Sequence, residues 1–200
     1  MTSEDLSKMI VVDSIAAGIR LVGTGKKGSE GCPAELVEQI ISDLRAGLVN
    51  PLSKGAFFAA LRFKGLEPQE EGFRDFFGAS IWNEPYWFAK EVCPDAPHAV
   101  QEFCGAVMDG KEFSREQTRT IGRFLFSDDP GDSARAFIAS LLRVRYASPE
   151  EYAGLLDAIH ETISPAFKEK VPGGNPIFQF AEPFDGMDDA PLFTPLLAAK

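Results

Sequence analysis

The sequence predicts a mainly α-helical protein in which two related four-helix units are followed by the incomplete start of an α/β domain. One pattern occurs twice, about eighty residues apart, at residues 56–73 and 136–155. Each copy is an apolar helix that ends in Arg-x-basic, followed by a Pro-x-Glu helix start. Apolar residues at helical spacing flank both copies, whereas short apolar runs bounded by Pro and Gly follow Pro165. Because a repeated pattern indicates a repeated supersecondary unit, the helical part is predicted to be a duplication.

The first helical unit is predicted to span residues 1–77. Its first helix is expected at residues 3–20, where apolar side chains recur at helical spacing. A second helix is expected to begin near Pro33, which suits a first turn because it lacks an amide hydrogen, and to end at Gly47. The third and fourth helices are expected at about 53–64 and 68–77.

Residues 78–98 form an aromatic connector between the two units. Trp82, Tyr86, Trp87 and Phe88 are concentrated there, between prolines. Aromatic side chains bury large areas, so we expect the connector to pack across the junction of the units. The alternative is an exposed binding surface, since Trp and Tyr dominate interface hot spots.

The second helical unit is predicted to span residues 99–164. Ser114 with Gln117, and Ser148 with Glu151, have the spacing of a capping box, in which two side chains satisfy free amides at a helix start. Helices are therefore expected at about 99–109, 114–126, 133–146 and 149–163. The acidic stretch 128–132 lacks the alternating oxygen ligands and the final Glu of a calcium loop, so a turn is expected there.

Residues 165–200 are predicted to be a linker and the first strand, loop and helix of a truncated α/β domain. The apolar run 177–181 is typical of a buried strand, the loop 182–186 follows it, and a capped helix start follows near Thr194. Because a lone strand and helix cannot make a sheet, we expect the chain to be part of a longer protein.

Composition narrows the classes of function. The net charge of −10 disfavours nucleic-acid binding, which rests largely on Lys and Arg that neutralise phosphates. No apolar run approaches the roughly 20 residues of a membrane span, and the N-terminus has no cleavage-site pattern. Three cysteines without a Cys-x-x-Cys favour reduced thiols, so a cytoplasmic protein is expected. His98 and His160 lie far apart in the sequence, and no metal site is predicted.

The first copy of the pattern also carries a resemblance to a known family. Gly47-Leu48-Val49-Asn50-Pro51, followed by residues 55–70 (Gly-Ala-Phe-Phe-Ala-Ala-Leu-Arg-Phe-Lys-Gly-Leu-Glu-Pro-Gln-Glu), is similar to the helical domain that begins anthranilate phosphoribosyltransferases and pyrimidine nucleoside phosphorylases. The second copy looks like a diverged duplicate. The resemblance implies a phosphoribosyl- or glycosyl-transferring parent that dimerises through this domain, uses phosphoribosyl pyrophosphate as donor and holds Mg²⁺ with acidic residues beyond this chain. It implies no cofactor in the chain itself.

The loop after the predicted strand departs from that family. The anthranilate enzymes have Gly-Thr-Gly-Gly-Asp there, whereas this chain has Ala181-Glu182-Pro183-Phe184-Asp185-Gly186. Glu182 would oppose a pyrophosphate, so we expect no transferase activity from this chain alone. Asp185 and Gly186 remain the residues of this loop that the resemblance places nearest a substrate. The alternative function is a non-catalytic dimerisation module, or one that binds a ligand or nucleic acid.

Two further sets of candidate residues lie in the helical part, and no catalytic residue is assigned. Arg62 and Arg143 end the two core helices, where the resemblance implies contact with a carboxylate acceptor; the alternative is a structural ion pair with an acid such as Glu70 or Glu151. The Gly-rich segment 23–29 suggests phosphate binding by Lys26, Lys27 and Ser29. The alternative is a connector, because the segment follows a helix rather than a strand.

A homodimer is predicted from the apolar content of the first unit. A small domain buries only about 60% of its unfolded surface, and this unit carries more large apolar side chains than that allows. The second unit could cover part of the excess, and a two-fold dimer is the commonest closed assembly. The side chains concerned are Leu36, Ile40, Phe57, Phe58 and Leu61.

Overall fold

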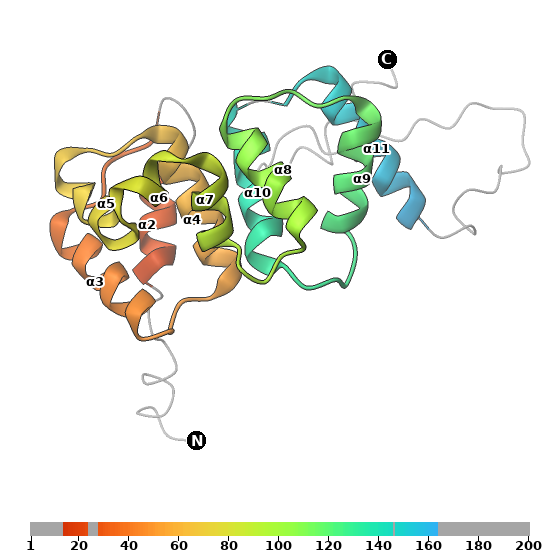
Figure 1. The fold of residues 1–200 in the computed structure, drawn as a ribbon. Helices are drawn as coiled ribbons and strands as arrows, with labels where there is room; N and C mark the ends of the chain where they lie inside the picture. Colours follow the sequence, from red (N-terminus) through yellow and green to blue (C-terminus); the bar gives the residue numbers. More distant parts are fainter. Residues whose placement is uncertain (1–13, 24–27, 146, 164–200) are drawn as a thin grey trace, which may run out of the picture. The chain divides into compact units, whose positions relative to one another are not determined.

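The computed structural model describes residues 14–23, 28–145 and 147–163, and this part of the chain is mainly α-helical (Figure 1). It contains helices α2 to α11 and one short 3-10 helix, and no strand occurs among these residues. All of them belong to one body, Met1–Ile163. The predicted helix start at 3–13 and the predicted strand, loop and helix of 165–200 lie outside the described residues, so the α/β start is not shown.

The helices follow one another in the order that the sequence predicts. The first unit consists of α2 (Ser14–Val22), α3 (Ala34–Arg45), α4 (Pro51–Lys64), the 3-10 helix η1 (Pro68–Glu70) and α5 (Glu71–Phe77). The second unit consists of α8 (His98–Met108), α9 (Arg115–Leu125), α10 (Asp132–Arg145) and α11 (Pro149–Thr162). Both predicted capping boxes are present, at the starts of α9 and α11.

Local chemistry explains where the structure departs from the expected bounds. Helix α4 begins at Pro51 rather than at residue 53, because the Asn50 side-chain oxygen accepts a hydrogen bond from the Leu52 amide at 2.8 Å. The connector is helical too: it holds α6 (Ala79–Asn83) and α7 (Pro85–Val92). Gly78, with a φ of 84°, turns the chain between α5 and α6.

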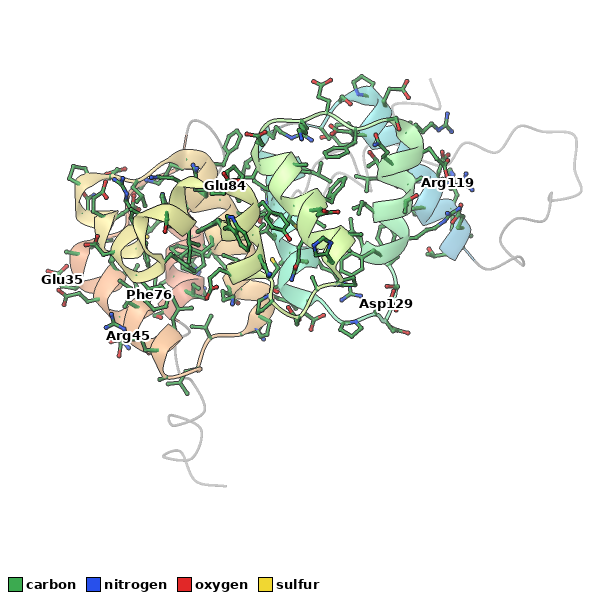
Figure 2. All side chains as sticks on the ribbon, in the orientation of Figure 1. Glu35, Arg45, Phe76, Glu84, Arg119 and Asp129 are labelled. Carbon is green, nitrogen blue, oxygen red and sulfur yellow. The ribbon has the colours of Figure 1, made fainter. Side chains whose placement is uncertain are left out.

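The duplication is visible in the register of the helices. Helix α10 begins 81 residues after α4 (132 against 51), and both helices are 14 residues long. Helix α9 begins the same 81 residues after α3 (115 against 34). The contacts repeat as well, because α2 packs on α4 as α8 packs on α10, and α5 packs on α3 as α11 packs on α9. In the α3–α5 pair, the Arg45 guanidinium lies over the Phe76 ring, 5.8 Å from its centroid (Figure 2).

Helices α4 and α10 pack against each other and join the two units. They approach so closely at Gly55 that an added Cβ would overlap the main-chain oxygen of Ser133. The apolar side chains of the first unit are buried in this arrangement: Phe57, Phe58 and Leu61 are completely inaccessible within one chain. Ile40 is buried as well and Leu36 is half-buried, so most of the apolar surface on which the predicted homodimer depends is covered within one chain.

The aromatic connector packs on both units. Trp82 and Phe88 lie with ring centroids 4.9 Å apart, and Phe88 contacts Phe58 of α4 at 6.3 Å. Helix α7 also packs on α8, as the prediction of packing across the junction requires. Trp87 points outward and is 53% exposed. Within the described part of the chain, no helix has the length and apolar character needed to cross a membrane.

Candidate functional site

A fully buried glutamate, Glu70, links three segments of the first unit by hydrogen bonds. The Glu70 carboxylate accepts a hydrogen bond from the Cys32 amide at 2.8 Å, just before α3. It also accepts from the Lys64 ammonium at 2.8 Å, at the end of α4, and from the Glu67 amide at 2.8 Å. The side chain of Glu70 is inaccessible to solvent. One carboxylate thus ties together the segments before α3, after α4 and at the start of η1.

The second unit repeats this site residue for residue. The Glu151 carboxylate, also inaccessible, accepts from the Phe113 amide at 3.2 Å and from the Ser148 amide at 2.7 Å. The Arg145 guanidinium donates to it at 2.6 Å. Each of these residues lies 81 positions after its counterpart: 113 against 32, 145 against 64, 148 against 67 and 151 against 70.

The electrostatics indicate that these carboxylates are structural. Burial raises the pKa of Glu151, but the hydrogen bonds from Arg145 and from the main-chain amides lower it more, so the pKa lies below its ordinary value. Burial lowers the pKa of Lys64, while Glu70 raises it more, so the net shift is upward. The lowered pKa of Glu151 favours the charged Arg145–Glu151 pair at neutral pH, and the raised pKa of Lys64 favours the charged Lys64–Glu70 pair. Neither group is therefore suited to proton transfer.

Arg62 is engaged with the connector rather than with a carboxylate. Its Nε donates to the main-chain oxygen of Trp82 at 3.0 Å, and its guanidinium lies 6.0 Å from the centroid of that ring. Burial lowers the pKa of Arg62. The predicted ion pairs of Arg62 with Glu70 and of Arg143 with Glu151 are wrong, because the pairing cations are two residues farther along each helix, as described above.

Arg143 lies in the wall of an apolar groove. The groove has a volume of about 650 Å³ and lies between α9, α10 and α11, with the first turn of α4 at its edge. Arg143 is exposed and, among the described residues, makes no hydrogen bond or ion pair. The other residues that line the groove are Leu52, Leu125, Phe126, Arg135, Ala136, Ala139, Leu142, Tyr152, Leu155 and Ile159.

The groove exposes large apolar side chains from three helices or their ends. Leu52 is 46% exposed, Phe126 48%, Tyr152 50% and Ile159 38%, an unusual concentration for a surface without a partner. Arg135 contributes its stem to the wall, but its guanidinium donates to the main-chain oxygens of Ser127 and Asp129 and is therefore already engaged. Of the two arginines that line the groove in the described part of the chain, Arg143 is thus the one available to a ligand.

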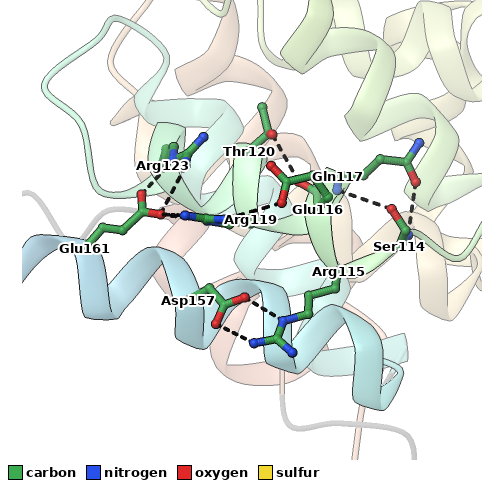
Figure 3. A network of polar contacts seen from close by, with 9 residues as sticks. All are labelled: Ser114, Arg115, Glu116, Gln117, Arg119, Thr120, Arg123, Asp157 and Glu161. Atoms are coloured by element: carbon green, nitrogen blue, oxygen red, sulfur yellow. Dashed lines mark hydrogen bonds and ion pairs between the residues drawn. The ribbon is translucent and has the colours of Figure 1, made fainter.

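A polar network fixes the helix that forms one wall of the groove. Arg115 of α9 binds both carboxylate oxygens of Asp157 in α11, at 2.6 and 2.8 Å (Figure 3). Arg119 and Arg123 bind Glu161 one turn farther along (Figure 3). Their hydrogen bonds lower the pKa of Glu161 to about 2. The network holds α11 against α9, which positions the apolar side chains of α11 toward the groove.

The remaining predicted site residues are not brought together by the described structure. Lys26 and Lys27 lie outside the described residues, as do Asp185 and Gly186. The Ser29 hydroxyl donates to the main-chain oxygen of Val22 at 2.9 Å and so closes the segment after α2.

Few of the described residues are suited to redox or metal chemistry. All three cysteines are buried and free. Burial and the neighbouring Glu70 raise the pKa of Cys32 to about 12. No group of three His, Cys, Asp or Glu residues in the part of the chain described here could hold a metal ion.

Comparison of the chain with protein-family models, with curated proteins and with solved structures finds no match.

Sequence reasoning missed both the buried glutamate sites and the groove. The signal for the glutamates was present, since each copy of the pattern has a basic residue and, six positions later, a Glu. For the groove the signal is a difference between copies: Phe58 aligns with Ala139, a much smaller residue, at the same spacing of 81. That difference indicates a face that the second unit leaves uncovered.

Proposed function

We propose that the chain is the helical part of a phosphoribosyltransferase-like protein and acts there as a non-catalytic binding and assembly module. The groove of the second unit carries the proposal. It combines about 650 Å³ of space, exposed apolar side chains on three sides and one exposed guanidinium, Arg143. Such a surface can bind apolar and hydrogen-bonding groups, but it places no nucleophile or base beside a reacting atom.

The residues that carry the family resemblance support a scaffold role. Asn50 caps α4, the apolar residues that follow fill the core, and Lys64 with Glu70 forms the buried ion pair. In the proposed longer protein, the phosphoribosyl donor and Mg²⁺ would be bound by residues outside this helical part. Free, buried cysteines suit the reducing cytoplasm, where we place the protein.

The first experiment tests for an open apolar surface with the dye 8-anilinonaphthalene-1-sulfonate. Its fluorescence should rise when the folded chain is added, and Ala139→Trp should reduce the rise because the indole fills the groove. Ala139 is exposed on α10, so this variant should fold. Ala99→Trp, at an exposed position of α8, is the control. An unchanged near-ultraviolet circular dichroism spectrum separates groove binding from dye binding by a loosened core, which would lose that spectrum.

Two outcomes would contradict the proposed function. Dye fluorescence that does not depend on Ala139 would mean that the groove is not an open binding surface. Turnover of phosphoribosyl pyrophosphate with anthranilate by the 200-residue chain would mean that the module is itself catalytic.

Self-association is a second candidate, favoured by the exposed apolar side chains around the groove. We propose a homodimer, for which a second copy of the chain supplies the partner surface. The test is sedimentation at micromolar concentration. A chain that stays monomeric there would contradict the homodimer and leave the groove to a different partner.

A further inference from the structure

The two units differ in what covers the same face of their core helices. In the first unit this face of α4 is formed by Phe58, Leu61 and Arg62. Phe58 and Leu61 are completely buried. The connector helices α6 and α7 provide part of the cover, because Phe88 contacts Phe58 and the Arg62 guanidinium donates to the main-chain oxygen of Trp82.

In the second unit the equivalent face is the floor of the groove. The residues 81 positions later are Ala139, Leu142 and Arg143, and all three line the groove. Ala139 is exposed where Phe58 is buried. Arg143 is exposed and has no hydrogen-bond acceptor among the described residues, whereas Arg62 has the Trp82 carbonyl. The second unit therefore leaves open the face that the connector partly covers in the first unit.

We propose that the groove binds a short helical peptide segment that carries aromatic side chains, and that Arg143 donates a hydrogen bond to a main-chain carbonyl at the C-terminal end of that helix. This inference rests on the proposed function and adds the class of partner. The chemistry follows from the first unit. Trp82 lies in the last turn of α6 (Ala79–Asn83), where helix carbonyls lack partners within the helix and a cation is favourable.

The dimensions and the charge of the groove fit such a partner. Ala139 leaves the space that the Phe58 ring fills in the first unit, so aromatic anchors can enter from outside. Apolar walls that receive one face of an amphipathic helix are a recurrent mode of peptide recognition. A nucleic acid would need several cations to neutralise phosphates, whereas among the described residues that line the groove only Arg143 is a cation without a partner.

The chain itself supplies the probe for the experiment. A fluorescein-labelled peptide of residues 78–92 contains the segment that covers the first unit, including Trp82 and Phe88. Its fluorescence anisotropy is measured as the 200-residue chain is added. We expect saturable binding, and none by the same peptide with Trp82→Ser and Phe88→Ser.

Variants of the groove assign the binding site. Ala139→Trp should weaken binding at least tenfold because the indole occupies the groove, while Ala99→Trp leaves it unchanged. Arg143→Ala should weaken it about tenfold through loss of a charge-assisted hydrogen bond. The matched control is Arg20→Ala, at an exposed position at the end of α2. Circular dichroism and melting temperature confirm that each variant is folded.

Three results would overturn the inference. The first is the absence of saturable binding by the wild-type chain, which would leave the groove empty or filled by another part of the protein. The second is equal binding by wild type and Ala139→Trp. It would mean that the peptide displaces residues 78–92 of the chain from the first unit. The third is a wild-type dimer that Ala139→Trp makes monomeric while the peptide fails to bind, which would assign the groove to a second copy. Dye binding that still depends on Ala139 would keep the proposed function in each case of peptide failure.

Discussion

Replacing either buried glutamate by glutamine should destabilise the fold strongly. Glu70→Gln keeps the shape of the side chain but exchanges one acceptor oxygen for a donor NH₂ group. Cys32 donates to one carboxylate oxygen of Glu70, and Lys64 and Glu67 donate to the other, all at 2.8 Å. In either orientation of the glutamine amide, its NH₂ group would therefore face a donor. The variant also leaves the Lys64 ammonium, whose side chain is 14% exposed, without a buried counterion.

The magnitude follows from the burial of this pair. Removing one partner of a buried ion pair costs about 3–5 kcal/mol because the remaining charge is uncompensated. In a chain of this size each kcal/mol lowers the melting temperature by roughly 2–4 °C, so Glu70→Gln should lower it by about 10 °C. Glu151→Gln should have a similar effect, because Arg145 takes the place of Lys64 in the second unit.

The assay is urea unfolding followed by circular dichroism, with Glu150→Gln as the control. Glu150 is adjacent to Glu151 in α11 but exposed, so its substitution should change the free energy of unfolding by less than about 0.5 kcal/mol. A loss below about 1 kcal/mol for both Glu70→Gln and Glu151→Gln would refute the reasoning. It would mean that the fold tolerates the loss of the buried carboxylate partner of Lys64, which also pairs with the half-exposed Glu67 at 3.3 Å, or of Arg145.

The pH dependence gives an independent check at Glu151. Its folded-state pKa is depressed, so its contribution to stability is present above the unfolded value of about 4.3 and is lost as the pH falls through the folded value. The difference in stability between wild type and Glu151→Gln should therefore narrow as the pH falls below about 4.3. A constant difference down to acid unfolding would contradict the assignment.

Three further predictions test other parts of the fold. Gly55→Ala should cost about 3 kcal/mol in urea unfolding, because the added Cβ overlaps the main-chain oxygen of Ser133; an unchanged midpoint would contradict the close approach of α4 and α10. Cys32, whose pKa burial raises to about 12, should not react with a disulfide reagent at pH 8 until urea unfolds the chain. The carboxyl pKa of Glu161, about 2 in the wild type, should rise toward 4.3 in Arg123→Ala when measured by nuclear magnetic resonance, and a pKa that stays near 2 would assign the shift to other groups.

Helix starts could be predicted from the sequence because their determinants are local. Ser114 and Ser148 begin α9 and α11 with capping boxes, as predicted. Helix α3 begins next to Pro33, as predicted, although Pro33 is its N-cap residue and not part of its first turn. Helix α4 begins at Pro51, two residues before its predicted start, because Asn50 caps it. The connector helices were missed because α6 has only five residues and closely follows the turn at Gly78.

The partner of each buried glutamate depends on tertiary structure and could not be predicted in the same way. Arg62 and Lys64 are two residues apart in α4 and therefore point about 200° apart around the helix axis. One faces the connector and the other faces Glu70, and the sequence alone does not say which. The groove depends even more on the whole fold, since it lies where α9, α10 and α11 leave Ala139 and Arg143 exposed.

The two copies differ where substitution costs least. A buried carboxylate needs charged or amide donors, so the second copy keeps a Glu and replaces Lys64 only by another cation, Arg145. The face of the core helix has no such requirement, because a large apolar residue can become a small one wherever its cover is removed at the same time. At this position the first copy has the large Phe58, buried beneath the connector, and the second copy has the small Ala139, which lines the groove. The same duplication can therefore use one copy to bury its own connector and the other to receive a segment from a partner.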